Sequence, residues 1–168
     1  MSEKDNEILK RSERIIKLFS AAKGINISKF PGSIPPFSKY LNGKIIDVER
    51  GKIIVEFDLK EEWANPTGLL HGGMQSAIID DTIGMCTATL GYEGFLITID
   101  AQYNFLGKIK VGEKALVSAK LVREGKNIIH FFAEIRDLND NLIATANANL
   151  LKTSYKPEYV REIDSFKE

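Results

Sequence analysis

The stretch Asn65 to Thr89, NPTGLLHGGMQSAIIDDTIGMCTAT, decides how the rest of the chain is interpreted. Its first four residues are typical of a turn, because proline fixes its own φ and disfavours a helical residue before it, and glycine accepts positive φ. Gly72 and Gly73 then open about 17 residues without proline. That length predicts a helix of roughly 25 Å.

The glycine pair at the predicted helix start indicates a ligand-binding backbone. A glycine in a helix costs about 0.5 to 1 kcal/mol relative to alanine, so a bare backbone at this point needs a reason. The first N–H groups of a helix lack internal partners and carry the positive end of its dipole. We therefore expect the backbone at Gly72 and Gly73 to approach an anion or a carbonyl oxygen.

Two carboxylates follow in the same helix. On a helical wheel Asp81 falls in the predicted apolar stripe of Met74, Ala77, Ile78, Met85 and Ala88, whereas Asp80 lies beside Gly73, Ser76, Gly84 and Thr87. A carboxylate flanked by small residues is open to a ligand, and one inside the stripe needs a buried partner. We favour Asp80 as the working acid; the alternative is that both are ordinary polar residues on a half-buried helix.

The spacing of Asn65, His71, Gly72, Gly73 and Asp80 resembles the signature of the hotdog-fold acyl-CoA thioesterases. The similar branch is that of the phenylacetate pathway and the human thioesterase superfamily. The resemblance runs from about Ala64 to Lys152, and the segment TIDAQYNFLGKIKVGE, Thr98 to Glu113, is similar to the next strand and loop of that branch.

The resemblance implies the chemistry of thioester hydrolysis. Asp80 would be the base or nucleophile, and the Gly72 N–H with the Asn65 side chain would bind the thioester oxygen as charge develops on it. Thr98 would help to hold the attacking water, unless it is a routine strand threonine. His71 would orient Asn65 or the oxyanion loop, or would only form hydrogen bonds at the helix start. In relatives the site lies between subunits, which implies a homodimer, often paired into a tetramer.

Coenzyme A would enter as part of the substrate, so no separate cofactor is expected. Its phosphates need cations, and the candidates lie in the loop after the Thr98 strand and in the next hairpin: Lys108, Lys110, Arg123 and Lys126. Each could equally be a solvated surface side chain. Met74, Ile78 and Met85 are candidate walls for the acyl group, although methionine in a helix stripe is usually core.

Two other functions remain open. The domain could be a non-catalytic acyl-CoA sensor or carrier, against which the presence of both Asp80 and Asn65 argues. It could also be a hotdog hydratase or dehydratase, which would be expected to carry a different local motif with a catalytic histidine and acid. Release of free thiol from acyl-CoAs, and an enoyl-CoA assay, separate the three.

The amino-acid composition limits the partners and the cellular compartment that we expect for the protein. The 168 residues include 23 basic and 23 acidic side chains, which cancel, so nothing indicates a nucleic-acid or membrane partner. A single cysteine, Cys86, fits a reducing cytosol, and we expect it to be a buried hydrophobe. No metal-ligand spacing occurs, and the charged N-terminus MSEKDNEILKR is unlike a signal peptide. We expect a soluble, cytoplasmic protein without a metal.

The remaining chain reads as scaffold, and we divide it into three parts. Residues 1–38 hold an amphipathic helix from about Asp5 to Ala22, capped by Asp5 or Ser2, and a proline-rich connector. The helix stripe would dock on the domain, on a second subunit or over a pocket. Residues 39–153 would form the hotdog domain, and residues 154–168 a loose polar tail.

Within 39–153 the period changes to two. Strands are predicted near 40–48, 53–59, 95–105, 113–123, 127–137 and 142–153, with hairpin turns at 49–51, 124–126 and 138–141. On the third strand Thr98 is expected to share one face with Asp100, Gln102 and Asn104. The expected class is α+β: an antiparallel sheet of about six strands wrapped around one long helix, with an extra N-terminal helix.

Overall fold

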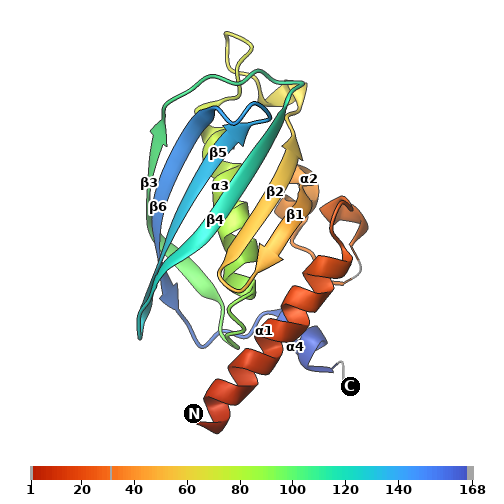
Figure 1. The fold of residues 1–168 in the computed structure, drawn as a ribbon, viewed down its shortest axis with the longest axis vertical. Coiled ribbons are helices and arrows are strands. Elements are labelled where there is room, and N and C mark those ends of the chain that lie inside the picture. The colour runs from red at the N-terminus through yellow and green to blue at the C-terminus, as the bar shows by residue number, and fades with distance from the viewer. Residues whose placement is uncertain (1, 31, 166–168) are drawn as a thin grey trace.

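The computed structural model describes residues 2–30 and 32–165 of the chain. One antiparallel sheet of six strands curves around a single long helix, α3 (Gly72–Ala88) (Figure 1). In chain order the strands are β1 (Lys44–Glu49), β2 (Lys52–Asp58), β3 (Leu96–Phe105), β4 (Lys114–Glu124), β5 (Ile128–Asp137) and β6 (Leu142–Lys152). In space their order is β1-β2-β4-β5-β6-β3, so β1 and β3 are the two edges. This is the predicted α+β hotdog architecture.

Alternation along the strands explains why they form one curved layer. In β2 the side chains of Ile53, Val55 and Phe57 are fully buried and point toward α3, while the residues between them face outward. The β1–β2 hairpin turns at Gly51, whose φ of 74° suits glycine. The remaining sheet pairs through consecutive hairpins and the β3–β6 pairing. The predicted order of strands and helix along the chain is therefore confirmed, with strand ends shifted by at most four residues.

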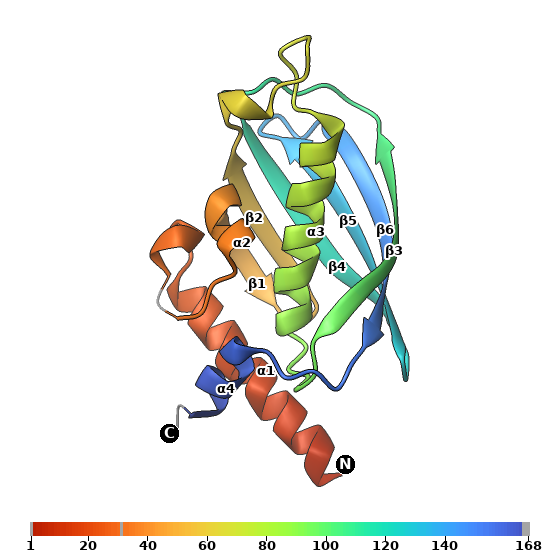
Figure 2. The same cartoon turned by 180° about the vertical axis from the view of Figure 1, so that it is seen from behind.

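The helix α3 buries a different face from the predicted one. Its fully buried members include Ile78, Ile79, Ile83 and Cys86, which pack on the inner side of the sheet. Met74, Ala77, Met85 and Ala88 are only half buried, so the stripe predicted from the helical wheel was rotated away from the true core. Figure 2 shows why: the sheet covers one side of α3, and the opposite side is left open between α2 (Pro36–Leu41) and β3.

The lone cysteine behaves as predicted. Cys86 is fully buried and its thiol contacts the Ala119 carbonyl oxygen at 3.6 Å. Burial raises the pKa of this thiol to about 12. It is therefore a small core hydrophobe and not a thiolate nucleophile.

The N-terminal helix α1 (Glu3–Ala21) docks on the domain, as one of the three expected arrangements had it. Ser2 caps it through the Asp5 N–H, and the Asp5 carboxylate accepts from the Ser2 N–H in return. Ile15 is buried against the domain, and the Ser12 hydroxyl donates to the Thr89 carbonyl oxygen at 2.6 Å. The helix thus covers the end of the barrel-like layer where α3 terminates (Figure 1).

The C-terminal segment corrects an expectation. Residues 158–165 form the helix α4 (Glu158–Ser165), where a loose tail was expected; residues 166–168 lie outside the described part. Its Val160 is fully buried, and Asp164 forms an ion pair with Arg11 of α1 at 2.7 Å. The apolar spacing is short, so the helix depends on tertiary contacts, which include the ion pair with α1 and the hydrogen bonds from Ser33 to Glu162.

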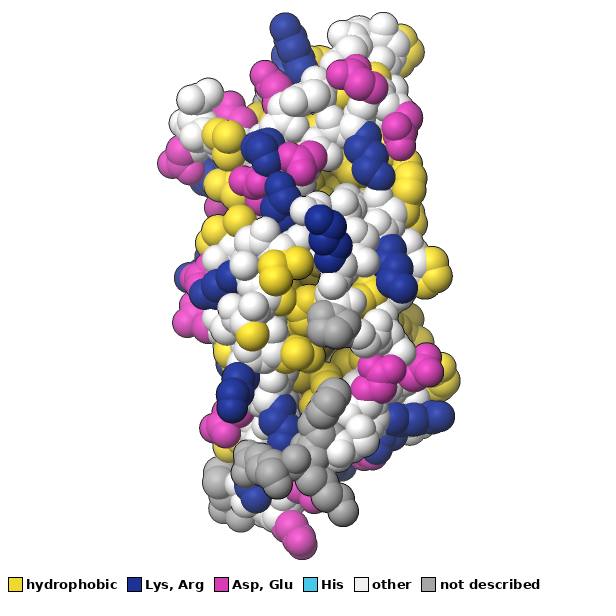
Figure 3. All heavy atoms as spheres, turned by 90° about the vertical axis from the view of Figure 1, so that its right-hand side faces the viewer, with side chains coloured by type: hydrophobic (Ala, Val, Ile, Leu, Met, Phe, Trp, Pro, Cys, Tyr) yellow, Lys and Arg dark blue, Asp and Glu magenta, His cyan; other side chains and the backbone are white. Residues whose placement is uncertain are grey.

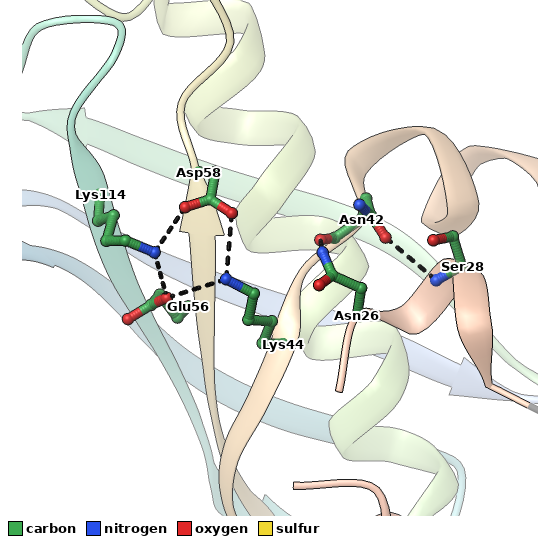
Figure 4. A network of polar contacts seen from close by, with 7 residues as sticks. All are labelled: Asn26, Ser28, Asn42, Lys44, Glu56, Asp58 and Lys114. Atoms are coloured by element: carbon green, nitrogen blue, oxygen red, sulfur yellow. Dashed lines mark hydrogen bonds and ion pairs between the residues drawn. The ribbon is translucent and has the colours of Figure 1, made fainter. Parts of the chain in front are cut away.

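The connector between α1 and β1 also holds more structure than expected. It contains a 3-10 turn, η1 (Ile27–Lys29), and the helix α2; β1 begins only at Lys44, later than the predicted strand near residue 40. Asn42 ends α2 in the left-handed region at φ 59°, and its side-chain oxygen accepts from the Ser28 N–H (Figure 4). Pro31, within the predicted connector, lies outside the described residues.

Charges on the outer surface are mixed in sign. At the start of β1 and β4, Lys114 contacts both Glu56 and Asp58 at 2.6 Å, and Lys44 contacts Asp58 at 3.2 Å (Figure 4). Lys, Arg, Asp and Glu alternate across the face shown in Figure 3, with hydrophobic atoms gathered along its middle. A single-sign stripe is therefore absent from that face. In the described part of the chain, none of the helices combines the length and the apolar character needed to cross a bilayer.

The docking of α1 depends on Gly91. A Cβ built at this position would lie 2.1 Å from the Ile8 carbonyl oxygen of α1, and its φ is 78°. We predict that Gly91→Ala lowers the free energy of unfolding by well over the 1 to 2 kcal/mol that the left-handed conformation alone costs. Gly24→Ala is the matched control, because Gly24 has φ 77° and open space around the new Cβ. Equal losses in urea unfolding would contradict the contact.

Candidate active site

The start of α3 leaves one backbone donor free. His71 is the residue that caps the helix, and its Nδ1 accepts from the Gly73 N–H at 2.9 Å. The Gly73 N–H is therefore already used, and the expectation that Gly73 binds substrate through it is corrected. Among the described residues the Gly72 N–H has no acceptor. Because Nδ1 accepts, the proton of the neutral ring is on Nε2.

Hydrogen bonds hold the side chain of Asn65 by its oxygen and leave its amide nitrogen available to a ligand. Its side-chain oxygen accepts three hydrogen bonds, from the Thr67 N–H at 2.9 Å, the Thr67 hydroxyl at 2.7 Å and the Leu69 N–H at 3.2 Å. These contacts close the turn that the Asn-Pro-Thr-Gly sequence predicts. In the part of the chain that the structure describes, the Nδ2 group makes no hydrogen bond. It is a free donor on a fixed loop.

Asn65 and Gly72 line the same cavity. It has a volume of about 210 Å³, and it lies between the Asn65 loop, the first turn of α3 and the segment that follows β3. Lys108 is on its wall, and the Phe105 ring, which is 52% exposed, is at its rim. A Cβ at position 72 would lie 3.3 Å from this ring, so any larger residue would push the ring outward by a few tenths of an ångström. The predicted oxyanion donors and one predicted cation thus come together.

The second group of predicted residues lies further along α3. Asp80 is exposed on the open side of the helix, and the Thr98 hydroxyl donates to its Oδ1 at 3.1 Å. Tyr103 is half buried on the same strand, and its pKa is raised by burial and by the negative charge of Asp80. Asp80 is therefore an accessible carboxylate with a hydroxyl partner, as the sequence suggested.

A β-bulge brings Thr98 to Asp80. The pairing shifts between Thr98, which faces buried Leu150, and Asp100, which faces Asn149. Asp100 consequently points to the outer surface and accepts from the Asn149 amide at 3.0 Å. The expectation that Thr98 shares a face with Asp100, Gln102 and Asn104 was wrong, because the bulged residue Ile99 reverses the alternation.

Asp81 finds its partner within the chain. The Ser38 hydroxyl of α2 donates to Asp81 Oδ1 at 2.5 Å, and Asp81 Oδ2 is buried without a partner among the described residues. Burial is the main cause that raises the pKa of Asp81; the Ser38 hydrogen bond lowers it, and the charge of Asp80 adds to the rise. The neighbouring carboxylates therefore differ: one is open to ligands and the other is a packing contact with α2.

Within one chain the donors at the start of α3 lie far from the Asp80 carboxylate. Gly72 and Asp80 are eight residues apart on one helix, which corresponds to about 12 Å along its axis. Among the predicted cations, Lys110 follows the cavity segment, whereas Arg123 and Lys126 lie at the far end of β4, about 30 Å of strand away from Lys114. Only Lys108 and Lys110 are near the cavity of their own chain.

Sequence reasoning missed several residues of this region. Gln75 lines the cavity and is 7% exposed, Phe105 forms its rim, and Ser38 anchors Asp81. Helix spacing from Gly72 could have placed Gln75 one turn into the site. Nothing local to residue 38 could have indicated its partner, because the contact spans 43 residues.

Fold and site together define a hotdog domain with a donor-lined cavity at one end of its helix. The Thioesterase superfamily pattern matches residues 67–144. A protein of Saccharolobus solfataricus that carries the name of an esterase is 32% identical over 108 residues, or 64% of this chain and 76% of the relative. Human acyl-coenzyme A thioesterase 13 is 29% identical over 90 residues, or 51% of this chain and 63% of the human protein.

A solved structure extends the likeness to three dimensions. The phenylacetic acid degradation-related thioesterase protein of Ralstonia eutropha superposes with a TM-score of 0.67 at 27% identity, covering 80% of this chain and 98% of that one. The chain therefore belongs to the thioesterase superfamily.

The raised pKa of Asp81 gives a stability prediction. A carboxyl whose folded pKa lies above its ordinary value of 3.8 makes the fold less stable as pH rises through the interval between the two values. We expect Asp81→Asn, which can still accept from Ser38, to be at least as stable as the wild type at neutral pH and to lack that fall.

Urea unfolding at pH 4 to 8 measures the effect of Asp81→Asn. Asp137→Asn is the control of opposite sign, because hydrogen bonds from Asn141 lower the pKa of Asp137, whose contribution is present at neutral pH and lost on acidification. An Asp81→Asn protein that loses stability at neutral pH would show that the ionised carboxylate stabilises the fold.

The two roles considered for His71 can be separated by substitution. His71→Ala should cost about 1 kcal/mol of stability, since the Gly73 N–H loses its acceptor. His71→Asn should recover most of that, because asparagine is a good helix cap. If capping is the only role, thioester turnover should recover together with stability. A stable His71→Asn protein with low turnover would instead assign the ring a chemical duty.

Proposed function

We propose that this protein is an acyl-CoA thioesterase that hydrolyses the thioester bond of an acyl- or aryl-CoA to a free acid and coenzyme A. The main support is the cavity at the start of α3, where neither the Gly72 N–H nor the Asn65 amide nitrogen donates to any of the described residues. Superfamily membership and the similarity to human acyl-coenzyme A thioesterase 13 favour the substrate class.

In the proposed mechanism these two donors bind the thioester oxygen. As the carbonyl carbon is attacked, negative charge develops on that oxygen, and fixed donors in a partly enclosed site stabilise it. Among the described residues neither donor has to be withdrawn from another partner, since the turn is closed by backbone hydrogen bonds and by the Asn65 side-chain oxygen, not by its nitrogen. Each donor of this kind is worth about 10²-fold in rate.

Asp80 supplies the base or the nucleophile. As a base it takes a proton from water while the water oxygen bonds to the carbonyl carbon; the C–S bond then breaks, and the thiolate leaves with a proton. As a nucleophile its carboxylate oxygen bonds to the carbonyl carbon, the C–S bond breaks and the thiolate leaves; water then opens the mixed anhydride, which frees the acid and the Asp80 carboxylate and releases a proton to the thiolate. Thr98, bonded to Asp80 at 3.1 Å, fixes the carboxylate and can hold the water.

The proposed site needs two copies of the chain. One carbonyl cannot touch both Gly72 and Asp80 of a single helix, because about 12 Å of helix lies between them. The open side of α3 carries Asp80, and the adjacent edge strand β3 exposes apolar side chains, including Ile97 at 47% and Ile99 at 52%. An unpaired apolar edge is a surface on which a second copy can pair. We propose a homodimer in which Asp80 of one copy faces Gly72 of the other.

Phosphate binding is proposed for Lys108 and Lys110, which lie on or next to the cavity wall. Arg123 and Lys126 lie too far away along β4 to serve the same chain's cavity, so any role for them requires the second copy. Binding through such surface cations should weaken as ionic strength rises.

A complementation experiment tests the catalytic assignment and the shared site together. Asp80→Asn should lower kcat by about 10²- to 10⁴-fold with an unchanged fold. Asn65→Asp keeps the oxygen that closes the turn but removes the donor, and should also be inactive. Co-expressed in equal amounts, the two should recover about a quarter of wild-type activity, because half of randomly formed dimers have one intact site of two.

Thiol release from acyl-CoAs measures the recovery, with each variant alone as the control. No recovery, with both variants folded and dimeric, would place both residues in the same chain's site. Full activity of Asp80→Asn alone would remove the carboxylate from the mechanism.

A further inference from the structure

Gln75 carries a buried acceptor that the proposed mechanism does not use. It lies one turn into α3, is 7% exposed, and its Nε2 donates to the Leu70 carbonyl oxygen at 3.1 Å. That contact fixes the orientation of the amide, since a carbonyl oxygen can only be approached by the nitrogen. The Oε1 atom is then left buried with no hydrogen-bond partner among the described residues.

Gln75 is one of the residues that line the cavity holding the two proposed oxyanion donors. Gln75, Asn65 and Gly72 all line the same space of about 210 Å³. A buried carbonyl without a partner costs about 1 to 3 kcal/mol, and native proteins rarely keep one unless a ligand or water satisfies it. The residues that line this cavity therefore carry two donors, on Asn65 and Gly72, and one buried acceptor, on Gln75.

The exposed and the buried side chains that line the cavity indicate which part of the substrate can reach Gln75. Phe105 and Lys108 are exposed at the rim, whereas Leu70 and Ile109 beside Gln75 are at most 3% exposed. Coenzyme A is large and charged, so it must stay at the solvent side. The acyl group is then the part that enters, and the volume suits a compact group, since a cavity of about 150 Å³ is enough for a benzene ring.

We infer that Gln75 is a specificity-determining residue whose carbonyl oxygen accepts a hydrogen bond from a hydroxyl or amino group on a compact acyl chain. This inference rests on the proposed function. An acyl group without a donor leaves the Gln75 oxygen unpaired in the complex, and a terminal carboxylate brings a second acceptor against it. Both are selected against, whereas a donor a few bonds from the thioester carbonyl is selected for.

The test compares substrates that differ by one hydroxyl group. Butyryl-CoA and its 2-, 3- and 4-hydroxy derivatives are hydrolysed by the wild type, by Gln75→Met and by the control Gln102→Met; Gln102 is exposed on β3. The ratio of kcat/KM for a hydroxylated substrate to that for butyryl-CoA, measured on one preparation, does not depend on the folded fraction. Methionine keeps the length of the side chain and removes both polar atoms.

We expect the wild type and Gln102→Met to prefer at least one hydroxylated substrate by about 10-fold, and Gln75→Met to reduce that ratio to near one. Hydrolysis of all four substrates without such a preference, or a preference that survives in Gln75→Met, overturns the role of Gln75 and leaves the thioesterase proposal standing. Failure to hydrolyse any thioester by a folded dimer overturns both.

Discussion

The rise of an α-helix governs the chemistry that this domain can perform. Gly72 and Asp80 are on one helix, and about 12 Å of axis between them cannot be shortened without breaking α3, which is packed along its length on the sheet. The donors at the helix start and the carboxylate further along must therefore act on different carbonyls, or on one carbonyl supplied with groups from two chains. In the proposed mechanism, which draws groups from two chains, assembly of the dimer is therefore a condition of activity.

The adjacent carboxylates Asp80 and Asp81 lie on one helix but in different environments, one exposed and one partly buried. Asp80 and Asp81 differ by about 100° around α3, which turns the first toward the open side and the second toward α2. Asp80 meets the Thr98 hydroxyl in an accessible position, whereas Asp81 is desolvated beside Ser38. Because burial disfavours its ionised form, Asp81 is unsuited to deliver water to a substrate, and its contact with Ser38 instead fixes α2 against α3.

Local patterns predicted most of the fold, and contacts distant in sequence account for what they missed. Period-two alternation and the Gly51 turn are properties of a few neighbouring residues, so strands and hairpins were predicted nearly as they lie. The helix α4 is short, and its amphipathic pattern becomes a stable helix through distant contacts such as Arg11–Asp164, which spans 153 residues. The bulge at Ile99 is likewise set by the pairing of β3 with β6, which decides the side on which Thr98 emerges.

The candidate site likewise has features that the local sequence predicts and features that depend on distant contacts. The turn at Asn65, the cap at His71 and the free Gly72 N–H follow from helix-start chemistry and were within reach of the sequence. The depth of the cavity was not, because it arises where the segment after β3 crosses the first turn of α3. Helix spacing from Gly72 places Gln75 near this site, but its unpaired oxygen follows from a tertiary detail, the contact of its amide nitrogen with the Leu70 carbonyl oxygen.

The glycine pair that first drew attention to the helix start has two separate explanations. At position 73 a Cβ would lie 3.1 Å from His71 Nδ1, so glycine preserves the cap. At position 72 it would press on the Phe105 ring, which forms the rim of the cavity beside the free N–H. Glycine at 72 thus brings an aromatic wall and an unpaired donor to the same point. The pair costs about 0.5 to 1 kcal/mol for each residue in conformational freedom, and it leaves a helix start whose Gly72 N–H, without an acceptor among the described residues, lies at the cavity.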